Sequence, residues 1–322
     1  MLSIPCCFMD LIYILECALL LVMVLGIYIR STTNPHPTIV FWPSEDKYKT
    51  NDGKSLKFDD IDDKPTVDLS VIVPAYNEED RLPAMLDECL EYLEGRKTSY
   101  EVIVVDDGSK DKTSDIGLKY TKQYGSSKVR VMTLTRNRGK GGAVRMGMLR
   151  ARGAQLLFAD ADGATTFSEL SKLEAELDKL GGKHGIVCGS RAHMQDESIA
   201  SRTFFRTVLM YGFHFCVWIF AVKSIRDTQC GFKLLTRDTG RIVFKSLHIE
   251  RWAFDVEMLK IAEMLSIPTR EVAVRWTEID GSKLNPILAA VQMFKDIFFL
   301  WCKYALGAWK LNVSSLENFK LD

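Results

Sequence analysis

Short apolar runs and helix-spaced apolar positions follow one another along the middle of the chain. Residues 69–73 form a run typical of a buried strand, and apolar residues then recur at helical spacing over 82–93. The same pattern predicts further strands at 101–105, 129–134, 156–159 and 186–188, and further helices at about 113–124, 142–152 and 170–180. Strands that alternate with helices predict an α/β, Rossmann-like fold, with a mostly parallel sheet and helices on both faces.

Each of the five predicted strands is followed by a polar, charged or glycine-rich stretch. In open α/β sheets, ligands bind beyond the carboxyl ends of the strands. We therefore expect these stretches to line one rim of the sheet. They are residues 74–78, 106–109, 136–142, 160–162 and 189–191.

Two carboxylates stand one residue apart at the end of the fourth strand, Asp160 and Asp162. They repel each other unless a cation lies beside them. Hard divalent ions such as Mg²⁺ or Mn²⁺ prefer oxygen ligands and often share them with substrate phosphates. The alternative is that one aspartate caps the next helix and the other is solvated. Their place on the rim favours a site that binds a metal and a diphosphate.

Basic residues on the same rim suit phosphate. Lys140 lies in a glycine-rich turn before a helix, where backbone N–H groups and a cation favour an anion. Val144 replaces the last glycine of a dinucleotide fingerprint and no Walker A run is present, which disfavours NAD or ATP chemistry. Arg191, Arg202 and Arg206 are further candidates for phosphate contact, although each could be an ordinary surface charge.

Asp106 and Asp107 end the second strand, where one of them could accept the N–H of a nucleobase on which Tyr76 stacks. The alternative is a simple turn, because Asp-Gly-Ser is common in turns.

The N-terminal segment differs from the rest. Residues 11–29 are apolar except for Glu16. This run is long enough to cross a bilayer and too long for a signal-peptide core. Lysines and arginines follow this run and none precedes it, so the positive-inside rule predicts that the rest of the chain faces the cytosol. Glu16 keeps open the alternative of a buried core helix.

The remaining boundaries follow from composition. We expect a membrane anchor over 1–30, a linker over 31–66, a globular domain over 67–285 and an amphipathic, membrane-associated segment over 286–322. Residues 208–222 and 287–309 are rich in aromatic residues and could lie at the membrane interface or in the core.

Charge and cysteine content limit the partners. Lys plus Arg and Asp plus Glu number 42 each, and this balance argues against nucleic-acid binding. The eight cysteines have no zinc-site spacing, so we expect free thiols in a reducing compartment. Nothing in the sequence indicates a protein partner.

The order and spacing of residues 74–78, 106–109, 160–162 and 189–191 resemble those of family 2 glycosyltransferases of GT-A fold. The runs at 227–233 and 276–283 resemble the branch that transfers sugars to polyprenyl phosphates, and the resemblance covers about residues 66–290. It is greatest to members of the endoplasmic reticulum membrane that transfer glucose from UDP-glucose to dolichyl phosphate.

This resemblance implies roles for particular residues. Asp106 or Asp107 would hold uracil, Asp160 and Asp162 would hold Mg²⁺ or Mn²⁺ on the diphosphate, and Lys140 would bind the donor. The uracil pocket would include Pro74, Tyr76 and Glu78. Arg191 would face a phosphate, and the acceptor phosphate or lipid would meet Arg202, Arg206, Gln229 and Lys283. One departure is Ala164, where related mannosyl enzymes have Gln, so the metal shell would depend more on water or diphosphate oxygens.

The resemblance also implies direct inversion at the sugar, without a strong general base, because the acceptor phosphate is already anionic. The run at 248–252 keeps the Arg-Trp of processive synthases but lacks their Gln. Two alternatives stay open: transfer from GDP-mannose, and an inactive scaffold that binds a nucleotide sugar or lipid. Asp255 and Glu257 either shape the acceptor side or belong to a helix N-terminus.

Overall fold

A mixed sheet forms the centre of the computed structural model, which describes residues 6–192, 212, 225–279 and 286–312. Within these residues the sheet has seven strands in the order β5-β4-β3-β6-β8-β7-β9, and only β8 is antiparallel to its neighbours. The strands are β3 (Val67–Ala75), β4 (Tyr100–Asp106), β5 (Val129–Thr133), β6 (Gly153–Ala159), β7 (Ile186–Ser190), β8 (Phe232–Thr236) and β9 (Thr269–Ala273). This arrangement confirms the α/β prediction.

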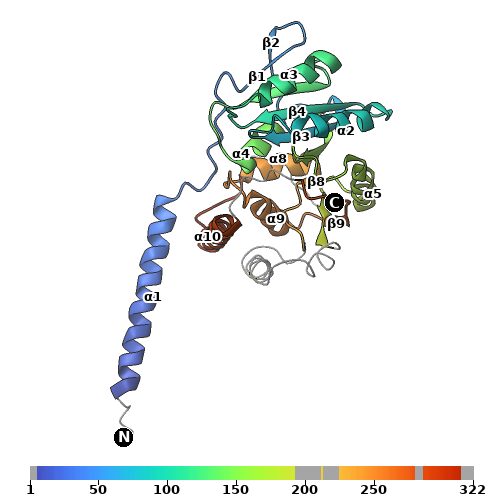
Figure 1. Cartoon of the computed structure of the whole chain (residues 1–322). Helices are drawn as coiled ribbons and strands as arrows, with labels where there is room; N and C mark the ends of the chain where they lie inside the picture. Colours follow the sequence, from blue (N-terminus) through green and yellow to red (C-terminus); the bar gives the residue numbers. More distant parts are fainter. Residues whose placement is uncertain (1–5, 193–211, 213–224, 280–285, 313–322) are drawn as a thin grey trace.

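Helices cover both faces of the sheet (Figure 1). On one face lie α2 (Leu82–Glu94), α3 (Thr113–Tyr124), the short 3₁₀ helix η1 (Phe167–Glu169) and α5 (Leu170–Leu180). On the other lie α4 (Lys140–Met148), α8 (Arg237–Ser246) and α9 (Phe254–Met264). Successive strand side chains point to opposite faces, so Val71 and Val73 enter the first core and Ile72 enters the second.

The carboxyl ends of the parallel strands meet at one rim, as the sequence predicted. Ala75 pairs with Asp106, and Asp106 pairs with Thr133, so β3, β4 and β5 end at the same level. The antiparallel β8 starts there, because Phe232 pairs with Ala159 at the end of β6. The turn before β8 is thereby brought to Asp160.

The N-terminal helix α1 (Cys6–Thr32) extends away from the α/β domain (Figure 1). Among the described residues it is the one helix long and apolar enough to cross a membrane, over Leu15–Thr32, and none of that stretch is buried against the domain. A core helix would be covered by protein, so the exposure of α1, including Glu16, argues against the core-helix alternative.

Residues 31–66, which the sequence predicted to be a linker, pack on the domain. They form a small hairpin of β1 (Lys47–Lys49) and β2 (Ser55–Lys57), and they bury Glu45, Phe58 and Ile61. Arg138 donates hydrogen bonds to Glu45 and to the carbonyl of Val40. The sparse apolar positions of this segment gave no periodic signal, because they pack singly into a surface made by other elements.

Helix α10 (Pro286–Ala305) is apolar on two sides. Met293, Ile297 and Leu300 are buried against the domain, whereas Phe294, Phe298 and Trp301 are exposed. One face of α10 therefore belongs to the core and the other is exposed, while contact of the exposed face with a membrane stays a prediction. Its C-terminal end approaches α1, where a Cβ on Gly26 would lie 3.3 Å from the Cδ2 of Leu306.

Candidate active site

Asp160 is held in place by the start of β8. Its backbone N–H donates to the carbonyl of Gly231 over 3.0 Å, and its side chain is about one-third exposed, at 32%. A Cβ on Gly231 would lie 2.0 Å from the Oδ2 of Asp160, so only glycine leaves room for this carboxylate. The close approach sets the position of Asp160 from two adjacent strands.

Asp162 lies in a loop that is fixed by the segment after β9. Its Oδ1 accepts the backbone N–H of Ala164 at 3.0 Å, and the carbonyl of Ala164 accepts the N–H of Thr277 at 2.8 Å. Thr165 and Trp276 form an antiparallel bridge beside them. Among the described residues, no hydrogen-bond partner is found for the Oδ2 of Asp162, so this oxygen is available to a ligand.

Lys140 lies between the two oxygens of Asp160. Its Nζ is 2.7 Å from Oδ1 and 2.9 Å from Oδ2. The turn before it needs Gly139, whose φ is +89° and where a Cβ would lie 2.8 Å from the carbonyl oxygen of Glu250. Burial opposes the charge of Lys140, but the carboxylates of Asp160 and Asp255 raise its pKa above the ordinary value.

Arg81 completes the positive side of this cluster. It pairs with Glu78 in bidentate fashion, at 2.7 Å and 2.6 Å. The hydrogen bonds that Arg81 donates to Glu78 raise the pKa of Arg81, and the charges of Asp162 and Asp160 add to this effect. Sequence analysis assigned Glu78 to the nucleotide pocket and missed Arg81; the i, i+3 spacing of the pair was the available signal.

Arg191 also reaches the rim, but it is held by a partner that the sequence analysis did not single out. Its guanidinium donates to both oxygens of Asp227, at 2.8 Å and 2.9 Å, and lies 5.3 Å from the ring centroid of Trp276. Burial opposes its charge, but the hydrogen bonds and charge of Asp227 raise the pKa of Arg191 above its ordinary range. A fixed, fully charged guanidinium with one side open suits a phosphate.

A second Lys–Asp pair lies beneath the rim. Lys233 is fully buried and donates to the Oδ1 of Asp255 at 2.6 Å and to the carbonyl of Cys230 at 2.7 Å. Burial alone would lower the pKa of Lys233, but Asp255 raises it. Asp255 therefore supports Lys233 and, through its charge, Lys140.

Glu257 lies in the first turn of α9 with Asp255 but has different contacts. It is buried and accepts the backbone N–H groups of His248 and Ile249 and the hydroxyl of Tyr304. It organises the loop before α9 and the end of α10, and it does not face the carboxylate pair.

The two aspartates after β4 are buried and well supplied with donors. Asp106 accepts the N–H of Ser109 at 2.9 Å and the hydroxyl of Ser114. Asp107 accepts the backbone N–H groups of Arg138 at 2.7 Å and Gly139 at 2.8 Å. Burial raises the pKa of Asp107 to about 6. Asp107 thus connects the end of β4 to the turn that carries Lys140.

The other predicted nucleotide residues lie close by in the chain. Tyr76 is 43% exposed, and Pro74 is half-buried at the end of β3. Asn77 next to Tyr76 has a positive φ of 55°, and its backbone N–H donates to the hydroxyl of Ser109 at 2.9 Å. These contacts join the loops after β3 and β4, and they leave the ring of Tyr76 on the surface.

Several acceptor-side candidates lie outside the described residues: Arg202, Arg206, Lys283 and the segment 208–222, of which only Gly212 is described. Gln229 is described and precedes Gly231, which contacts Asp160, by two residues. Its Nε2 is 3.3 Å from the sulfur of Met293, so it contacts α10.

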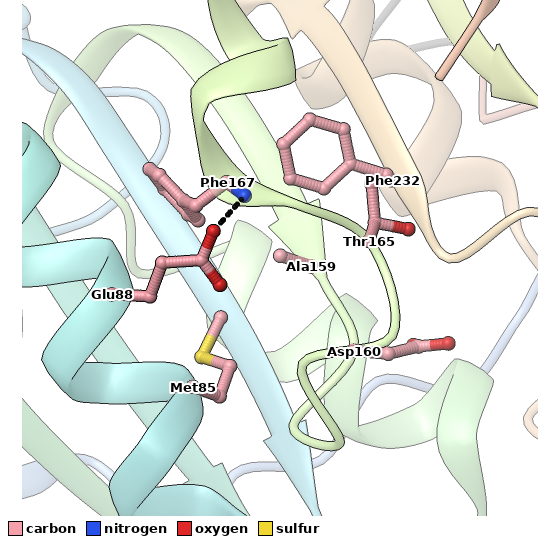
Figure 2. Close-up of a pocket in the computed structure, with 7 residues that line it drawn as sticks. All are labelled: Met85, Glu88, Ala159, Asp160, Thr165, Phe167 and Phe232. Atoms are coloured by element: carbon pink, nitrogen blue, oxygen red, sulfur yellow. Dashed lines mark hydrogen bonds between the residues drawn. The ribbon is translucent and has the colours of Figure 1, made fainter. Parts of the chain in front are cut away.

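A small cavity lies behind the carboxylate of Asp160 (Figure 2). Its volume is about 10 Å³, and its lining includes Met85, Phe167 and Phe232. Glu88 closes one side by accepting the backbone N–H of Phe167 at 2.8 Å. A cavity of this size holds about one water molecule and is too small for a sugar or a nucleotide.

The residues of the site can supply only some of the ligands of a divalent metal ion, and the others would come from water and substrate. Among the described residues no group of three or more His, Cys, Asp or Glu could hold a metal ion. Asp160 and Asp162 supply hard oxygen ligands, and the Oδ2 of Asp162 is available. Such a pair suits Mg²⁺ or Mn²⁺ whose other ligands are water and phosphate oxygens.

Comparisons with known proteins identify a family. Residues 70–237 match the model of the family described as glycosyl transferase family 2. The chain is 57% identical to dolichyl-phosphate beta-glucosyltransferase of Drosophila melanogaster, over 87% of this chain and 88% of that protein. It is 56% identical to the Homo sapiens protein of the same name, over 85% and 87%, and 38% identical to that of Saccharomyces cerevisiae, over 91% and 94%.

Solved structures show the same fold at much lower identity. One is mannosyl-3-phosphoglycerate synthase from Rubrobacter xylanophilus, with a TM-score of 0.52 and 15% identity over 74% of each chain. Another is glucosyl-3-phosphoglycerate synthase from Mycobacterium tuberculosis in complex with Mn²⁺, UDP-glucose and phosphoglyceric acid. It has a TM-score of 0.50 and 17% identity over 75% of this chain and 80% of that chain. The fold is therefore GT-A.

Proposed function

The chain belongs to glycosyl transferase family 2, and from this premise we propose that it transfers glucose from UDP-glucose to dolichyl phosphate with inversion, giving dolichyl β-D-glucosyl phosphate, the glucose donor for protein N-glycosylation. The observation that carries the proposal is the Asp160–Asp162 pair at the end of β6 with Lys140, Arg81 and Arg191 around it. The high identity to relatives named for this reaction supports the choice of donor and acceptor.

Asp160 and Asp162 are the residues that would hold Mg²⁺ or Mn²⁺ with the UDP diphosphate. A bound divalent ion supplies positive charge next to the phosphate oxygens on which negative charge develops. The neighbour of known structure that binds Mn²⁺ and UDP-glucose supports this choice of cofactor.

The chain's own cations stabilise the same charge. When the bond between the anomeric carbon and the phosphate oxygen breaks, the electron pair goes to the UDP β-phosphate. Lys140 is close to Asp160, and its charge is reinforced by Asp255, so it can transfer from the carboxylate to the diphosphate. Fixed charges aimed at a developing anion are the strongest electrostatic contribution available to such a site.

The acceptor side needs a cation more than it needs a base. An oxygen of dolichyl phosphate is already anionic, and it attacks the anomeric carbon from the face opposite UDP, which converts the α-linkage into a β-linkage. Arg191 is held open toward the rim by Asp227 and Trp276, and we assign it to a phosphate. Arg202, Arg206, Gln229 and Lys283 remain predictions for the acceptor phosphate and lipid.

The nucleotide would occupy the rim beside β3 and β4. Tyr76 offers an exposed ring for stacking, with Pro74 and Glu78 beside it. Asp106 or Asp107 would hold uracil, and Asp107 is the one of the two that also bonds the turn that carries Lys140. Its link to the Lys140 turn would join recognition of the base to binding of the diphosphate.

We place the protein in the endoplasmic reticulum membrane, crossed once by α1, with the catalytic domain in the cytosol. The apolar run of α1 and the positive charges that follow it support this topology. The exposed aromatic face of α10 suits contact with the same membrane.

The test is sugar transfer to dolichyl phosphate by the full chain in detergent, comparing UDP-glucose, UDP-galactose and GDP-mannose with Mg²⁺ or Mn²⁺. Transfer from UDP-glucose alone, abolished by a chelator and by Asp162→Ala, is the expected result. Transfer from GDP-mannose would overturn the donor assignment. Binding of nucleotide sugar without transfer from any donor would favour an inactive scaffold.

A further inference from the structure

An open pocket of about 820 Å³ lies at the point where α1 joins the domain. Its lining includes Thr32 and Thr33 at the end of α1, Arg136 and Asn137 in the loop before α4, and Lys303 near the end of α10. The loop before α4 also contacts Asp107, through the backbone N–H groups of Arg138 and Gly139, and leads directly into Lys140. No residue of the carboxylate cluster lines it.

The pocket has an excess of positive charge. Five of its lining residues are Lys or Arg, and Glu250 is the one carboxylate that lines it. Two of the five are neutralised, since Arg138 pairs with Glu45 and Arg145 pairs with Glu250.

Three cations therefore remain: Arg136, Arg251 and Lys303. None of them forms an ion pair with a residue in the described part of the chain. Arg136 and Arg251 are exposed, so both can turn toward a ligand.

An aromatic stack fixes the third cation. The ring of Trp309 lies flat on His248, with centroids 4.3 Å apart and an angle of 8°, and the Nζ of Lys303 is 4.4 Å from the centroid of Trp309. Glu257 holds His248 and Tyr304 behind this stack. Burial lowers the pKa of Lys303, and an anion in the pocket would restore it.

The position of the pocket indicates where its ligand comes from. The apolar stretch of α1 ends at Thr32, so a membrane crossed by α1 has its headgroup layer at this level. Leu306 touches α1 near Gly26, and the backbone N–H of Lys310 donates to the carbonyl of Pro35 at 2.8 Å. The end of α10 therefore lies beside the end of α1 (Figure 1).

We propose that this pocket binds the phosphate headgroup of an anionic membrane phospholipid, at a site whose lining does not include Asp160, Asp162 or Lys140. Basic pockets beside membrane helices on the cytosolic side suit such headgroups. The lipid would fix the domain relative to the bilayer, and its phosphate would lie between Arg136, Arg251 and Lys303. The proposal depends on membrane anchoring by α1 but not on the identity of the sugar donor.

The experiment is native mass spectrometry of the full chain released from detergent micelles with dioleoyl phosphatidic acid or dioleoyl phosphatidylcholine added. We expect one phosphatidic acid to be retained and phosphatidylcholine to be lost. Arg136→Gln/Arg251→Gln should weaken retention about 10-fold or more, since each basic residue near a membrane surface contributes appreciably to anionic-lipid binding. Lys47→Gln/Lys49→Gln removes the same charge from the exposed β1 strand and should leave retention unchanged.

Three outcomes would overturn the proposal. Equal retention by the Arg136/Arg251 variant would show that the lipid binds elsewhere. Equally tight binding of inorganic phosphate, measured by its protection against thermal unfolding, would identify a site for free phosphate. Displacement of phosphatidic acid by one equivalent of dolichyl phosphate would make the pocket part of the acceptor site. The melting temperature without lipid should match the wild type, and Lys303→Met provides a second variant if it does not.

Discussion

Two Lys–Asp pairs join helices α4 and α9 to the neighbouring strands β6 and β8 and have nearly the same length, but their surroundings differ. Lys140 and Asp160 are 2.7 Å apart at the rim, with side chains 15% and 32% exposed. Lys233 and Asp255 are 2.6 Å apart in the core, with side chains 0% and 4% exposed. A ligand can reach the first pair and replace Asp160 as the partner of Lys140, or Lys140 as the partner of Asp160. The second pair is buried, so no ligand can reach Lys233 or Asp255. The same chemistry therefore supports binding in one place and the fold in the other.

The largest loss of stability is expected for Lys233→Met. Asp255 would become a buried carboxylate without its cation, which costs about 3–5 kcal/mol in the free energy of unfolding. Chemical denaturation followed by tryptophan fluorescence measures this loss. Lys260→Met, which removes a half-exposed partner of Glu263, should change stability by less than about 0.5 kcal/mol. An equally small loss for Lys233→Met would show that the buried pair does not support the fold.

Substitutions at the rim should lower activity and leave stability nearly unchanged. Asp162→Ala should lower the transfer rate by about 10²–10³-fold, because a ligand of the proposed metal is lost, while the midpoint of unfolding stays near that of the wild type. Asp115→Asn, at an exposed carboxylate in the first turn of α3, is the matched control and should keep full activity. Retained transfer by Asp162→Ala would remove this aspartate from the site.

A smaller loss is expected for Lys140→Met. Transfer should fall about 10–100-fold, because one of several cations near the leaving phosphate is removed. Stability should change by only about 1 kcal/mol, since the solvent can reach Asp160 when the lysine is gone. Lys140→Arg keeps the charge and should recover part of the rate. If Lys140→Met instead destabilised the protein as much as Lys233→Met, the distinction between the two pairs would fail.

The sequence analysis identified both residues of the exposed pair, Lys140 and Asp160. Of the buried pair it considered only Asp255 and did not connect it to Lys233. Asp160 and Lys140 follow predicted elements directly, so the rule that parallel strands end at one rim was sufficient to bring them together. Asp255 was noticed without a partner, because Lys233 enters through the antiparallel β8, for which the chain gave no alternation signal. The roles of Asp227 and Gly231 were missed for the same reason, because they come from contacts between distant segments. Arg81 was missed although its i, i+3 pair with Glu78 is local.

The fold prediction succeeded where the apolar pattern was regular. The ends predicted for the helix Thr113–Tyr124 agree with the structure, and each of the five predicted strands is present. It failed for residues 31–66, where Phe58 and Ile61 are buried one at a time by other elements. The family and the GT-A fold are confirmed, while the roles of the individual site residues stay predictions.

The smallest predicted effect is a pH dependence of donor binding that arises from Asp107. Its carboxylate is buried and accepts backbone N–H groups, and it has no lysine partner among the described residues. Its pKa is raised from 3.8 to about 6, so the folded state favours the protonated form. Its contribution to stability is therefore largest in acid and is lost as the pH rises through about 6.

A loss of donor binding below pH 6 thus reports on the site and not on unfolding at this group. We expect UDP-glucose binding by the full chain, measured by calorimetry, to weaken by at most about 10-fold between pH 7 and pH 5, because protonation removes an acceptor from the turn that carries Lys140. UDP-glucose is suitable because its diphosphate has no terminal phosphate group that titrates in this range. Asp107→Asn should bind weakly at both pH values and remove the dependence; the same dependence in Asp107→Asn would assign the titration to another group.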